Sequence, residues 1–262
     1  MKRILVVADM HSGSRVGLTP PSYQYQLNSD DNDYYKYAVI QDKLWNWYKT
    51  KVEQVNTEKQ VDIVLGNADL IDGKGSRSGG TEQITTDRNK QAEIATECIR
   101  IVGASEGRLT YGTAYHTGTD EDMEQRVADS LGWKIESHGK YDIEGVKIDM
   151  RHFVSSSIIP YGRYTSISRE YLWRCIWEDR YQGSKPDILI RSHVHYFGFC
   201  GDADHICITT PALQGLGSKF GSRVCSGLVD FGFIVIDCHN GEYTWRPYTC
   251  LLQAESQSYE TL

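Results

Sequence analysis

The chain has 262 residues and a formal net charge of −7, with 35 acidic against 28 basic side chains. This length suits one large domain or two small ones with a substantial core, and the acidic balance gives no general basic surface for nucleic acid. No apolar run approaches the roughly 20 residues of a membrane span, and the N-terminal segment lacks the pattern of a signal peptide.

The seven cysteines are scattered along the chain and include no CxxC pair. This spacing favours reduced thiols over a disulfide framework or a zinc knuckle. We therefore expect a cytoplasmic protein that makes no use of a membrane.

The first part of the chain predicts buried strands that end at polar loops. Residues 3–8 form a continuous apolar run, typical of a strand buried on both faces. A tyrosine-rich segment, 12–37, follows, and a connection of that length is usually a functional loop. Helical spacing of apolar residues predicts a helix over 38–56. A second buried strand within 61–73 leads into a glycine-rich loop, 73–86.

The remainder of the chain predicts further elements of both kinds. The predicted helices are 88–102, 120–131 and 167–180. The predicted strands are 108–118, 145–153, 186–190, 205–210, 229–237 and 242–248. The sequence has no internal repeat, linker or low-complexity tract, so we predict one α/β domain over 1–262.

Five of these predicted strands end in side chains that can bind metal. The residues are Asp9, His11, Asp69, His116, His152, His193 and His195. His193 and His195 stand two apart after an apolar run, so in an extended segment both would point the same way. In α/β sheets ligands bind outside the carboxyl ends of the strands, and all seven side chains could converge there.

Mixed carboxylate and imidazole ligands suit Mn²⁺, Fe or Zn²⁺, whereas Mg²⁺ and Ca²⁺ prefer mostly oxygen. Seven candidates exceed the needs of one tetrahedral ion, which predicts two ions that share a bridging carboxylate. Two metals roughly 3.5–4 Å apart clamp both oxygens of an in-line displacement at phosphorus. The pattern therefore favours phosphoester chemistry.

The order of these motifs resembles that of the calcineurin-like metallophosphoesterases. The family carries D-x-H, G-D-x-x-D, G-N-H-[DE], a lone His and G-H-x-H, and this chain has "DMH" (9–11), "ADLID" (68–72), "GTAYH" (112–116), His152 and "SHVH" (192–195). The segment "TTPALQG" (209–215) is similar to the one after the last motif in phage-type members. The resemblance spans 3–198 and implies a four-layer α/β/β/α sandwich of two mixed sheets flanked by helices. A phage-encoded protein would work in the cytoplasm of its host.

The resemblance also implies roles for the motif residues. Asp9, His11 and His195 would bind the first metal, and Asp69 would bridge to the second. The second metal would be bound by His152 and His193. His116 would be the catalytic histidine that protonates the leaving oxygen, or a metal ligand in place of the family's asparagine.

The chain departs from the family pattern mainly in the third motif. "GTAYH" (112–116) has no asparagine, and Thr113, Asn67 or a water could fill that position. Ala68 and Ser192 replace glycines of the second and last motifs, which are milder changes. The altered third motif predicts that the second metal site is the weaker one.

Several other residues are candidates for supporting roles. Asp72 is expected to orient a ligand and not to bind metal itself. Arg163 and Arg169 follow the His152 loop and are candidates for binding a phosphate. Trp173 and Trp177, at i and i+4, are expected to pack in a helix interface.

We therefore predict a binuclear metal-dependent phosphoester hydrolase that uses a metal-bound hydroxide, with two Mn²⁺ ions favoured over Fe or Zn²⁺. The tyrosine-rich and glycine-rich loops should rim the pocket, and an aromatic rim suits a nucleobase, so a phosphodiesterase acting on a nucleotide or nucleic acid is preferred. The alternatives are a phosphomonoesterase, including a protein phosphatase, and a non-catalytic metal-binding module.

Overall fold

The computed structural model describes residues 1–27, 32–76, 78–117, 122–157, 159–216 and 229–251. Its strands form two mixed sheets. The first sheet has the strand order β11 (Glu242–Cys250), β10 (Phe231–His239), β1 (Lys2–Val7), β2 (Ile63–Gly66), β3 (Glu106–Thr110) and β4 (Lys134–Glu136). The second has the order β5 (Gly139–Ile143), β6 (Val146–Met150), β7 (Ile188–Arg191), β9 (Ile206–Thr209) and β8 (Gly198–Gly201).

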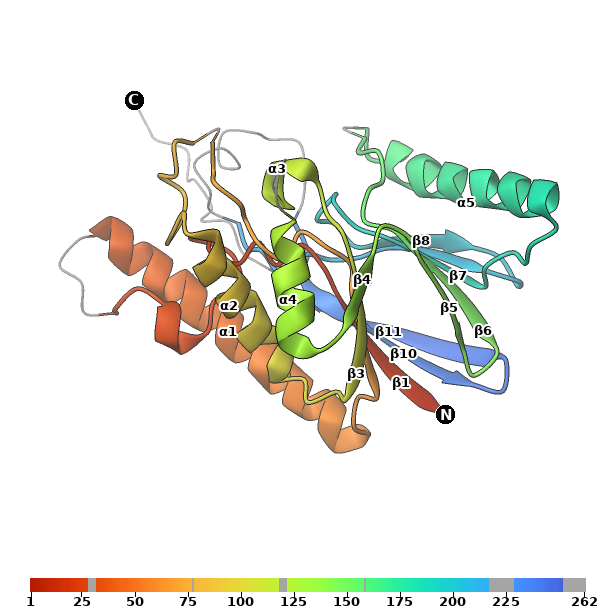
Figure 1. The fold of residues 1–262 in the computed structure, drawn as a ribbon, viewed down its shortest axis with the longest axis horizontal. Helices are drawn as coiled ribbons and strands as arrows, with labels where there is room; N and C mark the ends of the chain where they lie inside the picture. Colours follow the sequence, from red (N-terminus) through yellow and green to blue (C-terminus); the bar gives the residue numbers. More distant parts are fainter. Residues whose placement is uncertain (28–31, 77, 118–121, 158, 217–228, 252–262) are drawn as a thin grey trace, which may run out of the picture.

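Helices cover the outer faces of the two sheets (Figure 1). Those on the first sheet are α1 (Asn32–Glu58), α2 (Arg88–Arg100) and α4 (Met123–Leu131). The outer face of the second sheet carries α5 (Gly162–Tyr181), and two short helices, η1 (Pro21–Tyr23) and α3 (Ala114–Thr117), lie within loops. The predicted four-layer α/β/β/α architecture is confirmed. Among the described helices, none combines the length and apolarity needed to cross a lipid bilayer.

Each space between layers has its own hydrophobic core, as β1 illustrates. Leu5 and Val7 pack toward the helices α1, α2 and α4, whereas Ile4 and Val6 pack between the two sheets. Neighbouring side chains of a strand point to opposite faces of the sheet. A strand that is buried on both faces therefore has a continuously apolar sequence. A smaller core with Ile167 and Leu189 lies between the second sheet and α5.

The sheet topology gathers the ends of five parallel strands. In the first sheet β1, β2 and β3 pair in parallel, and in the second β6, β7 and β9 do so. The loops after β1, β2, β3, β6 and β7 carry every residue of the predicted metal site. The fold therefore supplies the convergence that the motif order predicts.

Some local predictions were wrong. β4, β5 and β8 were not predicted, because each is only partly buried and lacks a continuous apolar run. The tyrosine-rich segment was expected to be a loop as far as residue 37, but α1 already begins at Asn32, so Tyr34, Tyr35 and Tyr37 lie on a helix. The helix predicted over 167–180 begins earlier, at Gly162.

Candidate metal centre

Backbone hydrogen bonds continue past the strand ends and fix the loops that carry the candidate ligands. Asp9 N donates to Ala68 O and His11 N donates to Asp69 O, both at 3.0 Å, so the loops after β1 and β2 stay paired. In the second sheet Ser192 N donates to His152 O at 2.8 Å. The motif loops of the two sheets are also bonded to each other, for example from His193 N to Asp9 Oδ2 at 3.1 Å.

The backbone of these loops is strained. Of the nine described non-glycine residues with positive φ, six lie in the motifs: Asp9, His11, Ala68, Asp69, His193 and His195. Left-handed backbone costs free energy for a residue with a Cβ, and such strain concentrates at functional sites. Ala68, at φ +64°, keeps the conformation that suits the glycine found there in the resembled family.

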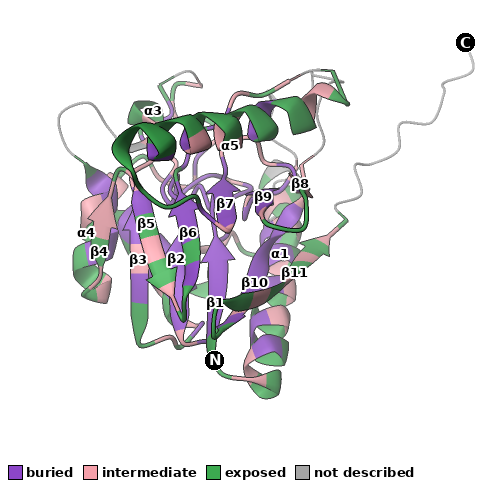
Figure 2. Cartoon of the chain, turned by 90° about the vertical axis from the view of Figure 1, so that its right-hand side faces the viewer, coloured by how far each residue is buried: buried purple, intermediate pink, exposed green. Residues whose placement is uncertain are grey.

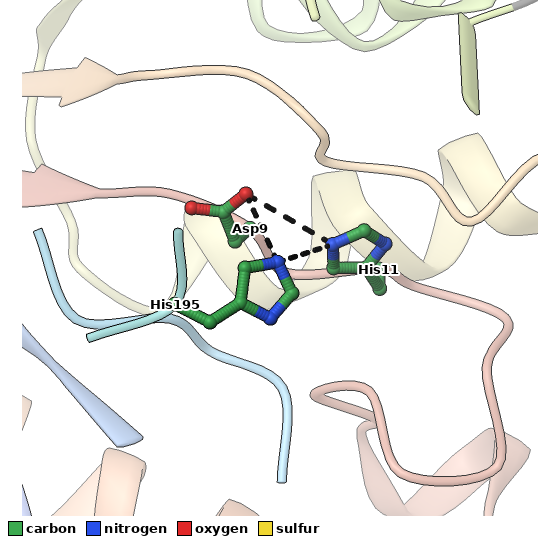
Figure 3. A group of neighbouring side chains, drawn as sticks. All are labelled: Asp9, His11 and His195. Atoms are coloured by element: carbon green, nitrogen blue, oxygen red, sulfur yellow. Dashed lines mark hydrogen bonds and ion pairs between the residues drawn. The ribbon is translucent and has the colours of Figure 1, made fainter. Parts of the chain in front are cut away.

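The first cluster consists of Asp9, His11 and His195 (Figure 3). Both Nε2 atoms face Asp9 Oδ1, that of His195 at 3.4 Å and that of His11 at 3.9 Å. The two Nε2 atoms are 3.2 Å apart. Asp9 Oδ1 is buried and accepts no hydrogen bond from a described residue. Three potential ligand atoms thus surround one point.

Asp72 orients His11 from the opposite side of the ring. Asp72 Oδ1 lies 3.2 Å from His11 Nδ1, so a proton on Nδ1 leaves the Nε2 lone pair directed at the cluster. His116 belongs to the same surroundings, because its Nδ1 donates to the backbone O of Asp72 at 2.8 Å. Its Nε2 lies 4.0 Å from Asp69 Oδ2. His116 therefore lies beside the candidate ligands with Nε2 directed inward.

The second cluster consists of Asp69, His152 and His193. His152 Nε2 lies 2.9 Å from Asp69 Oδ2, but the two groups are not aligned for a hydrogen bond, and Nε2 is a buried atom without such a partner. His152 Nε2 also lies 3.8 Å from Asp9 Oδ1, which links the two clusters. The His152 ring is oriented by Nδ1, which donates to Asn67 O at 2.9 Å.

Thr113, one of the candidates to fill the place of the family's asparagine, lies beside Asp69. Its backbone N donates to Asp69 Oδ1 at 2.9 Å, and its hydroxyl lies 3.3 Å from the same oxygen. Asn67 was a second candidate, but its carboxamide accepts from Thr110 and donates to Arg151 O and Ser192 Oγ. Asn67 therefore joins the strand ends structurally, and its side chain is not available to a metal.

Glu124 is a site residue that sequence reasoning missed. Its buried carboxylate accepts from Leu70 N at 2.8 Å and from Gly112 N at 2.7 Å, so it connects the second and third motif loops. Burial raises the pKa of Glu124 to about 8, and the neighbouring Asp69 adds to this effect. The available signal was only an acidic residue in the first turn of a predicted helix, a common feature that suits the helix dipole.

The electrostatics of the centre favour positive charge. Burial opposes ionisation of Asp9 and Asp69, yet the surrounding imidazoles lower the pKa of both carboxyl groups. Burial lowers the pKa of His152, but Asp69 and Asp9 outweigh it and raise that pKa to about 10. Burial together with His11 lowers the pKa of His116. The negative charges of Asp69 and Asp9 thus stabilise a proton on His152, and they would stabilise a metal cation in the same way.

The donor set fits divalent transition-metal ions. Ligand atoms about 2.0–2.2 Å from one ion lie roughly 3.0–3.5 Å from one another, and the shortest separations of the first cluster fall near that range. Asp9 Oδ1 and His152 Nε2 are buried polar atoms without hydrogen bonds, which is costly unless another group satisfies them. Carboxylate with imidazole is a donor set for Mn²⁺, Fe or Zn²⁺.

The two predicted phosphate-binding arginines lie differently. The Cζ of Arg163 lies 4.5 Å from the centre of the Tyr196 ring, next in sequence to His195, and its buried Nε has no hydrogen-bond partner among described residues. Arg169 is exposed and donates to Ser155 Oγ at 3.3 Å. Arg163 thus contacts a residue that adjoins a metal motif.

Aromatic side chains near the centre differ from those expected. Tyr25 packs against Tyr34 at 5.0 Å and Tyr37 at 6.4 Å between ring centres, and the Arg15 guanidinium lies over the rings of Tyr34 and Tyr37. These tyrosines therefore pack against one another and against Arg15 within the segment, and Tyr34 remains 40% exposed. By contrast, Phe153 is 58% exposed, and its ring centre lies 5.0 Å from that of His193.

No protein-family model matches the chain, and no curated protein is similar to it in sequence. Among solved structures, Vps29 with Zn²⁺ from Entamoeba histolytica is similar at 16% identity and a TM-score of 0.49, over 94% of this chain and 92% of that one. A novel archaeal phosphodiesterase is similar at 13% and 0.44, over 94% and 99%. A predicted phosphoesterase from Streptococcus pneumoniae is similar at 10% and 0.37, over 94% and 98%. At these identities the likeness concerns the fold alone.

Proposed function

We propose that the chain is a binuclear metal-dependent phosphoester hydrolase of the calcineurin-like metallophosphoesterase type. The observation that carries this proposal is the meeting of two clusters, Asp9–His11–His195 and Asp69–His152–His193, across the ends of two sheets. Their linking atoms, Asp9 Oδ1 and His152 Nε2, are 3.8 Å apart, and neither has a hydrogen-bond partner among the described residues. Asp69 would serve both ions, and Mn²⁺ is the preferred metal.

Two divalent cations would supply Lewis-acid stabilisation of phosphoryl charge and a lowered pKa for water at the site. The chain's own residues would orient the reaction. Asp72 holds His11 through Nδ1, and Asn67 O holds His152 in the same way, so both rings keep Nε2 toward the centre. Loss of a group that orients a metal ligand typically lowers metal affinity by about 10- to 100-fold.

We assign to His116 the proton that the leaving oxygen needs. Its Nδ1 is occupied by the backbone O of Asp72, so Nε2 is the atom that would exchange the proton. The ring is largely but not fully buried, with 18% of its side chain exposed, which leaves a route to substrate. General acid catalysis of this type is typically worth about 10²–10⁴-fold.

A phosphodiester of a nucleotide or nucleic acid is the preferred substrate. A diester carries a second organic substituent, and the exposed Phe153 ring beside His193 offers a surface for it. Stacking of a base on an aromatic ring is worth ~1–3 kcal/mol. Arg163, next to Tyr196, is the proposed contact for a non-bridging phosphate oxygen.

The experiment that tests this function compares bis-p-nitrophenyl phosphate with p-nitrophenyl phosphate in the presence of Mn²⁺. A diesterase prefers the first substrate, and a phosphomonoesterase prefers the second. A protein that binds Mn²⁺ but hydrolyses neither is a metal-binding module without turnover. Asp9→Asn is the control: activity that persists in this variant would come from a contaminating phosphatase.

A further inference from the structure

The outer surface of α5 carries apolar side chains that nothing in the described chain covers. We call Leu172, Trp173, Ile176 and Trp177 the α5 stripe; their exposed fractions are 60%, 54%, 46% and 46%. Leu172 with Ile176 and Trp173 with Trp177 are i, i+4 pairs, so the four form two adjacent ridges on one side of the helix. Figure 2 shows α5 on the outside of the molecule with a largely exposed outer surface. The expected packing of the two tryptophans inside the chain is therefore wrong.

α5 departs from the usual surface helix, because it buries two charged residues beside Ile167 and exposes several large apolar ones. The inner face includes the buried Arg174, whose Nε lies 2.8 Å from Asp149, and the buried Glu178, which pairs with Lys140 at 2.6 Å. These ion pairs fix which side of α5 meets the sheet. Within one copy of the chain, the α5 stripe is therefore exposed as far as the described residues are concerned.

The size of the stripe suits a protein interface. A large apolar side chain has a surface of up to about 150–250 Å². The exposed parts of the four side chains therefore amount to on the order of 400 Å² of apolar surface. Exposed patches of a few hundred Å² are commonly functional, and a standard interface buries roughly 800 Å² per partner. The stripe would form the centre of such an interface, and tryptophan is the residue type most enriched in interface centres.

The charged residues beside the stripe are spaced so that those of one copy would face opposite charges on a second copy related by a two-fold axis. Arg169 and Asp179 are both exposed and lie at equal sequence distances on either side of Arg174. Leu172 and Ile176 are also equidistant from Arg174. If two copies of α5 meet antiparallel about an axis at that level, Arg169 of one copy lies opposite Asp179 of the other, and Leu172 opposite Ile176. A two-fold interface repeats each such contact.

We propose that the α5 stripe binds the α5 stripe of a second copy of this chain, in an antiparallel two-fold arrangement. The apolar ridges form its centre and the Arg169–Asp179 pairs fix its register. This inference does not depend on the proposed reaction, because the stripe shares no residue with the metal clusters.

Sedimentation velocity over a wide range of protein concentrations tests the proposal. Wild type is expected to sediment as a dimer. Ile176→Lys places one charge from each copy in the centre of the interface, so it should raise the dissociation constant of the dimer by roughly 100-fold. The matched control is Val39→Lys, an exposed apolar residue of α1 (42%), which should stay dimeric. Circular dichroism confirms that each variant is folded.

A charge exchange tests the arrangement itself. Arg169→Asp should weaken the dimer, and adding Asp179→Arg should restore it, since the opposite charges then face each other again. A wild type that is monomeric at every concentration, or an Ile176→Lys variant that remains dimeric, would overturn the proposal. So would a monomeric wild type that binds phosphatidylcholine vesicles through the stripe. Failure of the double variant to recover would overturn the antiparallel arrangement.

Discussion

Asp9 Oδ1 and His152 Nε2 lie 3.8 Å apart, although Asp9 follows β1 in the first sheet and His152 follows β6 in the second. Both atoms are buried and neither takes part in a hydrogen bond with a described residue. Burial of polar atoms without hydrogen bonds is costly, and a cation bound by both clusters would offset that cost.

We expect wild type to retain about two equivalents of Mn²⁺ per chain. Asp69→Asn should weaken binding of both ions because it removes the proposed bridge, whereas His195→Ala should empty mainly the first site. Elemental analysis after loading and desalting measures this. His239→Ala, at an exposed histidine outside the clusters, is the control. A wild type that never retains metal under any loading would contradict the assignment.

Gly112→Ala should disrupt the second cluster. A Cβ at this position would lie 2.1 Å from Asp69 Oδ1 and 2.8 Å from Asp69 N, so the carboxylate would have to move. We expect at least a tenfold loss of affinity for the weaker ion, which calorimetric titration with Mn²⁺ would measure. Gly79→Ala is the comparison, because a Cβ there meets no atom within 4 Å. Equal affinities in both variants would argue against Asp69 as a ligand.

His116→Ala should slow substrates with poor leaving groups by about 10²–10⁴-fold and affect p-nitrophenyl esters far less. The reason is that an activated aryl oxide leaves without a proton. Steady-state rates across leaving groups of graded pKa provide the measurement. Metal content should stay intact. Loss of one equivalent of metal in this variant would make His116 a ligand instead.

Asp149→Asn should destabilise the fold in a pH-dependent way. Burial opposes ionisation of Asp149, but His138, Arg191 and Arg174 lower its pKa from 3.8 to about 2. Because the folded pKa is the lower one, the stabilisation is present above 3.8 and is lost as the pH falls through about 2. We expect a loss of roughly 3 kcal/mol near neutral pH, since the fully buried Arg191 would lose its partner.

Urea unfolding of the Asp149→Asn variant and wild type measures this difference, which should narrow as the pH falls below about 4. Asp142→Asn, on the neighbouring strand β5, removes an exposed carboxylate and should change stability little. A gap between Asp149→Asn and wild type that is independent of pH would indicate that the substitution acts through packing alone.

Phe153→Ala should raise KM for a dinucleotide while leaving kcat nearly unchanged, because a stacking surface is lost without altering the metal clusters. The expected factor is about 5–100, the range that corresponds to ~1–3 kcal/mol. Tyr25→Ala is the matched comparison, and its KM should remain near that of wild type because Tyr25 packs against other tyrosines. A raised KM in Tyr25→Ala and an unchanged KM in Phe153→Ala would indicate that the substrate binds to the tyrosine-rich segment instead.

The layered fold and the convergence of the motifs could be predicted because both depend on local patterns. Buried strands such as β1 read as continuous apolar runs, and parallel strands place their ends together. Edge strands such as β5 and β8 could not be predicted in the same way, since they are only partly buried and so lack a continuous apolar run.

The supporting contacts of the site were less accessible to sequence reasoning. Glu124 acts through two backbone N–H groups, and no side-chain motif reports such a contact. The role of Asn67 depends on Thr110 and Ser192, which are distant in sequence and meet only in the folded chain. Exposure of Trp173 and Trp177 was missed because an i, i+4 apolar pair is the same whether it faces a core or solvent.

The division of the centre between two sheets also has a consequence for synthesis on the ribosome. The carboxylates Asp9 and Asp69 emerge early, whereas the imidazoles of His152, His193 and His195 emerge only in the second half of the chain. β10, which flanks β1 as its antiparallel neighbour, emerges later still. If the proposed centre binds metal, its two clusters are therefore complete only after both sheets have been synthesised and have docked.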